Sequence, residues 1–160
     1  MSDQAIVTRL RDRPALLDPV VGWIDEEWAE YSGRSLQQTR ERFASELDSG
    51  ASQLPCTLVA TLGDQPAGVL SLREQDSTDY DPGKLPWICN VYVPASCRGK
   101  GIASALCLAG EAVAKAMGFD AIYLANEHGE ASLYGAIDYR VYKAYGDERG
   151  AQQLMSKNLS

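Results

Sequence analysis

The segment 98–103, RGKGIA, combines glycine with positive charge in a pattern that suits the binding of an anion. It follows the apolar run 87–93 and precedes residues with the periodicity of a helix. The first N–H groups of a helix have no partner within the helix and carry partial positive charge. Glycine at positions 99 and 101 removes the Cβ atoms that would hold a phosphate away, and an arginine and a lysine add full charges. The residues alone therefore predict a phosphate or pyrophosphate site at the start of this helix.

Two better-known phosphate motifs do not fit this segment. The pattern GxxxxGK[ST] is absent, which excludes a P-loop. The pattern GxGxxG is incomplete over 99–104, and no acidic residue follows at a strand end about 20 residues later, as dinucleotide binding would require. On this segment alone, an ordinary basic turn remains the alternative.

The elements that must position this turn follow from the periodicity of the apolar residues. In chain order the pattern predicts a strand over 5–10, helices over 16–28 and 35–47, strands over 56–62, 67–73 and 87–93, a helix over 101–117, a strand over 121–124, a helix over 131–137, and closing strands over 140–145 and 153–157. Ser35 and Gln38 predict a capping box at the start of the second helix. The nearly continuous apolar residues of 87–93 predict a strand that is buried on both faces. This order predicts a single α/β or α+β domain over residues 1–160, with a mixed sheet.

Composition limits the classes of function. The chain has 160 residues, 45% of them hydrophobic, and it contains no apolar run near the ~18 residues that a membrane span needs. Its start lacks the apolar region of a secretory signal, so we expect a cytoplasmic protein that does not enter membranes. A net charge of −7 argues against nucleic acid as a partner. The same charge is compatible with a cationic substrate, although solubility alone accounts for it.

The four cysteines lack the spacing of a metal site. Cys56, Cys89, Cys97 and Cys107 form no CxxC pair, which favours buried free thiols over zinc ligands. We also expect Cys89 to be a core thiol rather than a nucleophile, because no basic residue adjoins it in the sequence.

The flanks of the basic turn carry a family resemblance. Residues 91–94, VYVP, followed by RGKGIA, resemble motif A of the GNAT superfamily of acyl-CoA-dependent N-acetyltransferases, whose fixed positions are filled here by Arg98, Gly101 and Ala103. Residues 131–134, ASLY, followed by Tyr139, are similar to motif B of that superfamily. The resemblance covers 57–159. It implies a mixed, mainly antiparallel sheet of about six to seven strands with flanking helices and two strands that splay at the cofactor cleft.

The resemblance implies acetyl-CoA as the co-substrate. Its pantetheine arm is expected between the splayed strands and its pyrophosphate on the N–H groups of the basic turn. The implied cofactor-binding residues are Val91, Tyr92, Val93, Arg98, Gly99, Lys100, Gly101, Ile102, Ala103, Ser104, Asn126 and Tyr134. Asn126 lies near the asparagine of motif B but out of register with it.

The resemblance also implies part of the catalytic machinery. Tyr134 matches the family tyrosine that acts as general acid towards the leaving sulfur. Many relatives carry a glutamate on the strand before motif A, but residues 87–90 contain no acid. Glu74 is therefore our first candidate for the general base, with Glu127 and His128 after it. Direct attack by a neutral amine, with water carrying the proton away, is an equal alternative.

Motif B departs from the family pattern at one turn. Asp138 stands where the family carries glycine, and aspartate tolerates a left-handed conformation better than most residues.

The resulting expectation is an N-acetyltransferase that moves an acetyl group from acetyl-CoA to a primary amine by direct attack in a ternary complex. The acceptor is open between a polyamine-like or aminoglycoside-like small molecule, an amino-acid derivative and a peptide N-terminus. A homodimer is compatible with the resemblance. The alternative is a non-catalytic acyl-CoA-binding regulatory module, which would keep the basic turn and lack acid–base chemistry.

Overall fold

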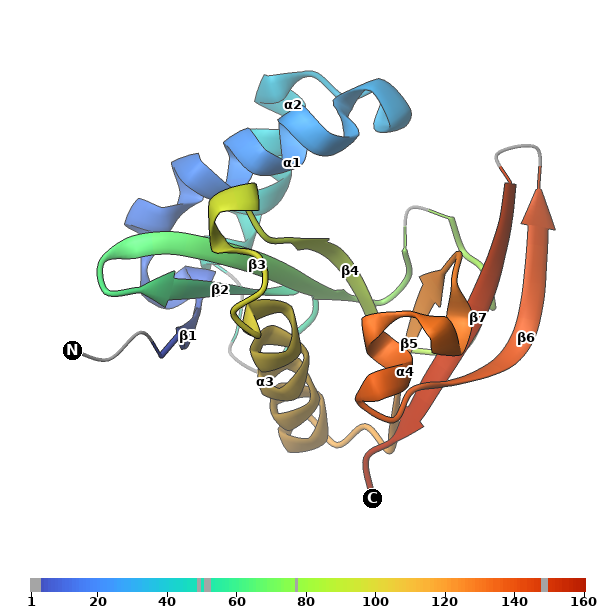
Figure 1. Ribbon diagram of the computed structural model, residues 1–160. Coiled ribbons are helices and arrows are strands. Elements are labelled where there is room, and N and C mark those ends of the chain that lie inside the picture. Colours follow the sequence, from blue (N-terminus) through green and yellow to red (C-terminus); the bar gives the residue numbers. More distant parts are fainter. Residues whose placement is uncertain (1–3, 49, 51–52, 77, 148–149) are drawn as a thin grey trace.

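The computed structural model describes residues 4–48, 50, 53–76, 78–147 and 150–160. Its centre is a seven-stranded sheet in the order β1-β2-β3-β4-β5-β7-β6 (Figure 1). The strands are β1 (Ile6–Arg9), β2 (Cys56–Leu62), β3 (Gln65–Arg73), β4 (Trp87–Tyr92), β5 (Ala121–Asn126), β6 (Arg140–Asp147) and β7 (Gly150–Asn158). Neighbouring strands are antiparallel except β4 and β5, which run parallel. The expected mixed, mainly antiparallel sheet is confirmed.

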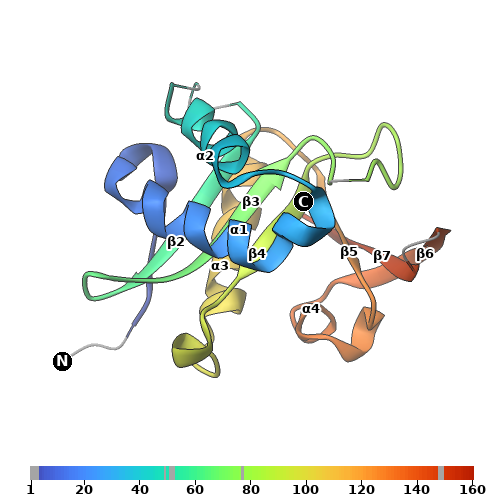
Figure 2. The ribbon, with the colours of Figure 1, turned by 90° about the horizontal axis from the view of Figure 1, so that it is seen from above.

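Helices cover both faces of this sheet. Helices α1 (Leu17–Ser32) and α2 (Leu36–Ala44) lie on one face, and α3 (Ile102–Ala116) lies on the other (Figures 1 and 2). The core divides accordingly, because successive strand residues point to opposite faces. Val59 and Val69 pack with α1, whereas their neighbours Leu58 and Leu70 pack with α3. The short helix α4 (Leu133–Ala136) lies beside the β6–β7 hairpin (Figure 1).

The two helices that cover the first face are delimited by local sequence signals. Helix α1 ends at Gly33, whose φ of 72° is the left-handed conformation that favours glycine. The predicted capping box is present at α2, where Gln38 N–H donates to Ser35 Oγ at 3.1 Å and Ser35 N–H donates to Gln38 Oε1 at 2.8 Å. Helix α2 ends earlier than predicted, and a 3₁₀ turn over Ser45–Asp48 follows it.

Strands β4 and β5 diverge and open the sheet. Only Trp87 and Tyr123 pair between them. On its other side β4 bulges against β3, since Tyr92 pairs with Val69 and Cys89 pairs with Ser71, so that two residues of β4 oppose one of β3. The first half of β4 is buried and its second half is half-buried. The prediction of a strand buried on both faces is therefore wrong for the second half, because its neighbour turns away.

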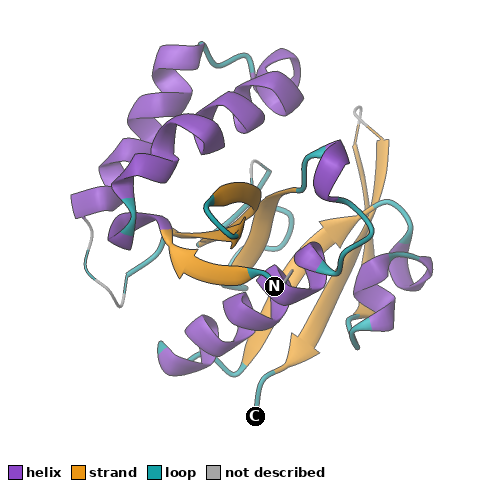
Figure 3. Ribbon diagram, turned by 60° about the vertical axis from the view of Figure 1, so that its left-hand side comes forward, coloured by secondary structure: helices purple, strands orange, loops and turns teal. Residues whose placement is uncertain are grey.

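Strands β6 and β7 form the predicted hairpin (Figure 3), and residues 148–149 of its expected turn lie outside the described residues. Within the described ranges, no helix combines the length and the apolar character needed to cross a membrane.

Candidate active site

A cavity of ≈ 490 Å³ lies between the second half of β4, the start of α3 and helix α4. Its lining comprises Glu27, Val91, Tyr92, Val93, Cys97, Arg98, Gly99, Gly101, Ile102, Ala103, Ser104, Leu133 and Tyr134. Most of the residues predicted to bind acetyl-CoA are thus brought together around one space. We call it the cofactor cavity.

The basic turn forms one end of the cofactor cavity. Gly99 and Gly101 have φ of 79° and 77°, so both occupy the left-handed region, where a Cβ introduces strain. A Cβ added at either position would meet no protein atom within 4 Å. These glycines are therefore required by the backbone conformation, and the space above them is open. The first helical bond of α3 runs from Ala105 N–H to Gly101 O at 3.0 Å, which leaves the N–H groups of residues 102–104 without a helical acceptor.

Arg98 is anchored beside these N–H groups. Its Nε donates to Val93 O at 2.9 Å, which holds the guanidinium against the end of β4. Lys100 is exposed and is not among the residues that line the cofactor cavity. Of the two cations in the basic turn, Arg98 alone is held at the cavity.

Tyr134, on α4, also lines the cofactor cavity. Burial, followed by the nearby Cys107 and Asp76, raises the pKa of the Tyr134 phenol well above its usual range. Within the described part of the chain, its hydroxyl makes no hydrogen bond. Tyr134 is therefore a protonated donor at the cavity that has no acceptor among the residues described.

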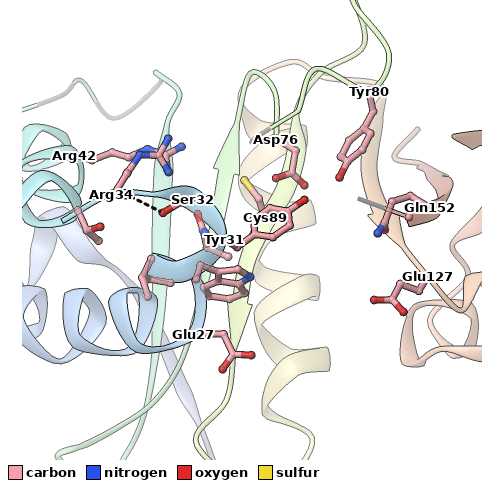
Figure 4. Close-up of a pocket in the computed structure, with 15 residues that line it drawn as sticks. Glu27, Tyr31, Ser32, Arg34, Arg42, Asp76, Tyr80, Cys89, Glu127 and Gln152 are labelled. Carbon is pink, nitrogen blue, oxygen red and sulfur yellow. Dashed lines mark hydrogen bonds between the residues drawn. The ribbon is translucent and has the colours of Figure 1, made fainter. Parts of the chain in front are cut away.

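A second cavity, of ≈ 420 Å³, adjoins the first and is lined by α1, α2, β4, the loop after β3 and the ends of β5 and β7 (Figure 4). Its lining comprises Ile24, Glu27, Trp28, Tyr31, Ser32, Arg34, Thr39, Arg42, Asp76, Tyr80, Cys89, Asn90, Glu127, Gly150 and Gln152. We call it the acceptor cavity.

The two cavities meet at the bulge of β4. Cys89 and Asn90 line the acceptor cavity, and the next residue, Val91, lines the cofactor cavity. Asn90 has a φ of 55°, and its Oδ1 is buried without a hydrogen-bond partner among the described residues. Glu27 of α1 lines both cavities. A molecule in one cavity would therefore face a molecule in the other across Glu27 and the bulge.

The model of the acetyltransferase (GNAT) family matches residues 20–139, three quarters of this chain. The chain belongs to the GNAT family. Acetyl-CoA, the co-substrate expected from the sequence, is consistent with this membership and with the cofactor cavity.

Solved structures of GNAT acetyltransferases share this fold. An aminoglycoside 6'-N-acetyltransferase complexed with coenzyme A is similar over 97% of both chains, with a TM-score of 0.75 and 16% identity. The aminoglycoside 6'-N-acetyltransferase from Enterococcus faecium is similar over 97% of both chains, with a TM-score of 0.71 and 18% identity. The spermidine/spermine N-acetyltransferase SpeG from Vibrio cholerae, in mutant form, is similar over 98% of this chain and 95% of its own, with a TM-score of 0.71 and 14% identity. No curated protein matches the chain by sequence.

Several predicted residues lie away from the cavities of this GNAT fold. Glu74 directly follows β3, is exposed and lines neither cavity. Asn126 does not line the cofactor cavity, and its Oδ1 instead accepts the N–H of His128 at 2.8 Å. His128 is exposed and lines neither cavity. Of the three candidates for the general base, only Glu127 lines the acceptor cavity.

Glu27 lines both cavities but was not among the residues predicted from the sequence. It stands beside the apolar stripe of α1, one residue before Trp28, and shows no motif. No local signal marks it, because Glu27 reaches the two cavities only where α1 packs beside β4, some sixty residues later in the sequence.

Cys89 and Tyr139 lie in surroundings that suit a structural role rather than a catalytic one. Burial raises the pKa of the Cys89 thiol strongly, which disfavours the thiolate that a nucleophile needs. Tyr139 is fully buried, and its hydroxyl donates to Glu111 Oε2 at 3.0 Å. Glu111 in turn pairs with Lys157 at 2.8 Å. Asp138, just before Tyr139, has a φ of 76°. This is the left-handed conformation expected at a position where the family carries glycine.

Proposed function

We propose that this GNAT protein transfers the acetyl group of acetyl-CoA to a primary amine held in the acceptor cavity. The observation that carries the proposal is the meeting of two separate cavities at Glu27 and the β4 bulge. One cavity ends on a basic helix N-terminus and the other on mixed charges, so they suit two different molecules. Direct transfer in a ternary complex requires this arrangement.

The residues of the cofactor cavity fit the parts of acetyl-CoA. The N–H groups of residues 102–104 and the guanidinium of Arg98 would bind the pyrophosphate. The half-buried side chains of Val91 and Val93 suit the pantetheine arm. When bound, acetyl-CoA supplies an acetyl group activated as a thioester.

The groups at the junction suit the movement of two protons. Asn90 Oδ1 accepts an N–H of the amine, and Glu27 takes the proton that the nitrogen loses as the new C–N bond forms. As the C–S bond breaks, Tyr134 donates its phenolic proton to the sulfur, and solvent water then carries the proton held by Glu27 back to Tyr134, which restores both groups. Among the described residues, Glu27 is the one carboxylate that lines both cavities, so it replaces Glu74 as our proposed base.

Thermal unfolding with and without acetyl-CoA tests the first half of this proposal. Ligand at about a hundred times its Kd should stabilise the protein by roughly 2.7 kcal/mol, which raises Tm by several degrees. We expect Arg98→Glu to abolish this shift. The matched control is Lys100→Glu, which makes the same charge reversal two residues away at an exposed position outside the cavity lining. No shift in the wild-type protein, or an equal loss in both variants, would contradict the assigned cofactor site.

Release of free thiol from acetyl-CoA in the presence of amines tests the second half. An acetyltransferase releases coenzyme A in step with an acetylated amine. A regulatory module that only binds acyl-CoA would give the thermal shift and release no thiol with any amine. The two outcomes separate the enzyme from the binding module.

A further inference from the structure

Two arginines on one side of the acceptor cavity have no part in the proposed proton transfers. Arg34 lies in the turn between α1 and α2, and Arg42 lies on α2. Figure 4 shows their side chains together on the α2 side of the cavity, opposite Glu127 and Gln152. Both arginines are half-buried, so they are not freely solvated surface charges.

The positive charge of this pair is not neutralised within the described part of the chain. Nearby arginines do have carboxylate partners, since Arg40 pairs with Asp18 and Arg73 pairs with Glu46 at 3.3 Å. Neither Arg34 nor Arg42 makes a side-chain hydrogen bond or an ion pair with a described residue. Two neighbouring guanidinium groups therefore face a cavity without a counter-ion from those residues.

The surroundings of Arg42 disfavour the charged form of its guanidinium group. Burial, together with repulsion by Arg73 and Arg34, lowers the pKa of Arg42 to about 10, although the nearby Glu46 acts in the opposite direction. Burying a cation without a partner costs free energy, so an anion bound beside Arg34 and Arg42 would be stabilised by both. Planar guanidinium groups bind carboxylate and phosphate oxygens through paired N–H donors.

The opposite parts of the same cavity carry negative charge. Glu27, Asp76 and Glu127 line it away from the two arginines (Figure 4). The charge of the cavity is thus unevenly distributed, with the positive side chains at α2 and the negative side chains on its other parts. Its volume of ≈ 420 Å³ suits a small molecule.

We propose that the acceptor is a small zwitterionic amine, whose carboxylate or phosphate binds Arg34 and Arg42 while its amine points towards Glu27 and Asn90. The inference rests on the proposed function, because that function places the acceptor amine in this cavity. An acceptor with only positive groups would bring like charge to the two arginines, which disfavours it.

Matched amine pairs test the acceptor class through thiol release from acetyl-CoA. L-lysine against cadaverine and L-phenylalanine against phenethylamine differ only in a carboxylate, and O-phosphoethanolamine against ethanolamine differs only in a phosphate. We expect the anionic member of at least one pair to be preferred by about tenfold to a hundredfold in kcat/KM. The pair that shows the preference identifies the anion. Equal use of both members, or preference for the members without an anion, would overturn the inference while leaving the acetyltransferase function in place.

Two variants and one control tie the preference to the arginines. We expect Arg42→Gln and Arg34→Gln to reduce the preference to less than about threefold, mainly through KM. Arg40→Gln removes a guanidinium from the same helix, but this residue is exposed, pairs with Asp18 and does not line the cavity. It should keep the preference of the wild type. A preference that survives in both cavity variants would contradict the assigned role.

A binding measurement distinguishes this inference from the proposed function. The thermal shift that the same amines cause in the protein saturated with coenzyme A needs no turnover. A shift caused by anionic members, and lost in Arg42→Gln, would support the zwitterion site even if no thiol were released, in which case the proposed function fails alone. If anionic amines cause no thermal shift and also give no turnover, the inference is overturned.

Discussion

The two cavities of this protein are built in different ways. The cofactor cavity takes most of its lining from one stretch, residues 91–104, in which strand, turn and helix start follow each other directly. The acceptor cavity takes its lining from six separate parts of the chain, from α1 to β7. A site made from contiguous residues carries its geometry in a local pattern, whereas an assembled site exists only when distant elements meet. Acetyl-CoA binding should therefore tolerate changes in α1 and α2 that alter the acceptor.

Loss of the Tyr134 hydroxyl should have the largest effect on the cofactor side. We expect Tyr134→Phe to reduce kcat by about 10²- to 10⁴-fold, because it removes the proton donor for the sulfur. Because the pKa of Tyr134 is raised, the phenol stays protonated and its ionisation should cause no loss of kcat below about pH 10. Steady-state kinetics against pH measures both effects.

Tyr139→Phe is the matched control for this tyrosine. It also removes one phenolic oxygen, but that oxygen is bound to Glu111 and does not line the cavity. We expect it to lower the free energy of unfolding by about 1–3 kcal/mol and to leave kcat near the wild-type value. Equal kinetic losses in the two variants would remove Tyr134 from the mechanism.

Of the arginines near the acceptor cavity, we expect Arg73 to stabilise the fold and Arg42 to serve function without stabilising it. Arg73→Met leaves the carboxylate of Glu46 buried without its partner, which should cost about 3–5 kcal/mol of the free energy of unfolding. Arg42→Met removes an unneutralised cation, so the free energy of unfolding should stay the same or rise by up to about 1 kcal/mol. Chemical denaturation of both variants measures the difference. A large loss for Arg42→Met would mean that this residue stabilises the fold.

The pH dependence of the Arg73→Met variant follows from Glu46. Burial raises the pKa of this carboxyl, so the folded state holds its proton more readily than the unfolded chain does. The free energy of unfolding therefore falls as pH rises through the raised pKa of Glu46, and it is retained below the pKa of the unfolded chain. The Arg73→Met variant should therefore lose less stability in mildly acidic buffer than at neutral pH. The opposite trend would contradict the assigned pairing.

Backbone geometry gives a smaller effect on the cofactor side. We expect Gly101→Val to lose most of the roughly 2.7 kcal/mol that saturating acetyl-CoA adds, because a β-branched residue cannot hold a φ of 77° at the start of α3. Gly63→Val is the control, since Gly63 also has a positive φ, of 59°, but lies in the β2–β3 turn away from the cavity. Both variants should carry similar intrinsic strain, and only Gly101→Val should lose the ligand-induced rise in Tm.

The smallest effect is expected where the family glycine is replaced. Asp138→Ala should lower the free energy of unfolding by about 1 kcal/mol, because alanine tolerates the left-handed conformation less well than aspartate. Asp138→Gly should not lower it. The ion pair that Asp138 forms with Arg140, at 3.8 Å, is exposed and contributes little to the free energy of unfolding. A loss in the glycine variant as large as in the alanine variant would show that the side chain of Asp138 matters more than its backbone.

The sequence predicted those features whose causes are local. The capping box at Ser35, the basic turn at 98–103 and the order of strands and helices all depend on residues within a few positions of each other. The half-buried end of β4 could not be predicted, because it depends on the direction that β5 takes some thirty residues later. Glu74 was chosen because it follows a strand, yet the chain leaves the sheet at that point. Glu27 reaches the site only because α1 packs across the sheet beside β4.

Because Trp87 and Tyr123 form the one pair between β4 and β5, the backbone hydrogen bonds of the sheet fall into two nearly separate groups. One group joins β1, β2, β3 and β4, and the other joins β5, β7 and β6. The side chains stay joined, since Ile122 and Leu124 of β5 share the core beneath α3 with Leu70 of β3. The two halves of the sheet therefore share one hydrophobic core, while the backbone amides that face the gap can exchange with solvent without unfolding of that core. A pantetheine arm in that gap would act as a substitute strand, and its arrival would be recorded as slower amide hydrogen exchange in the second half of β4, without a movement of one half against the other.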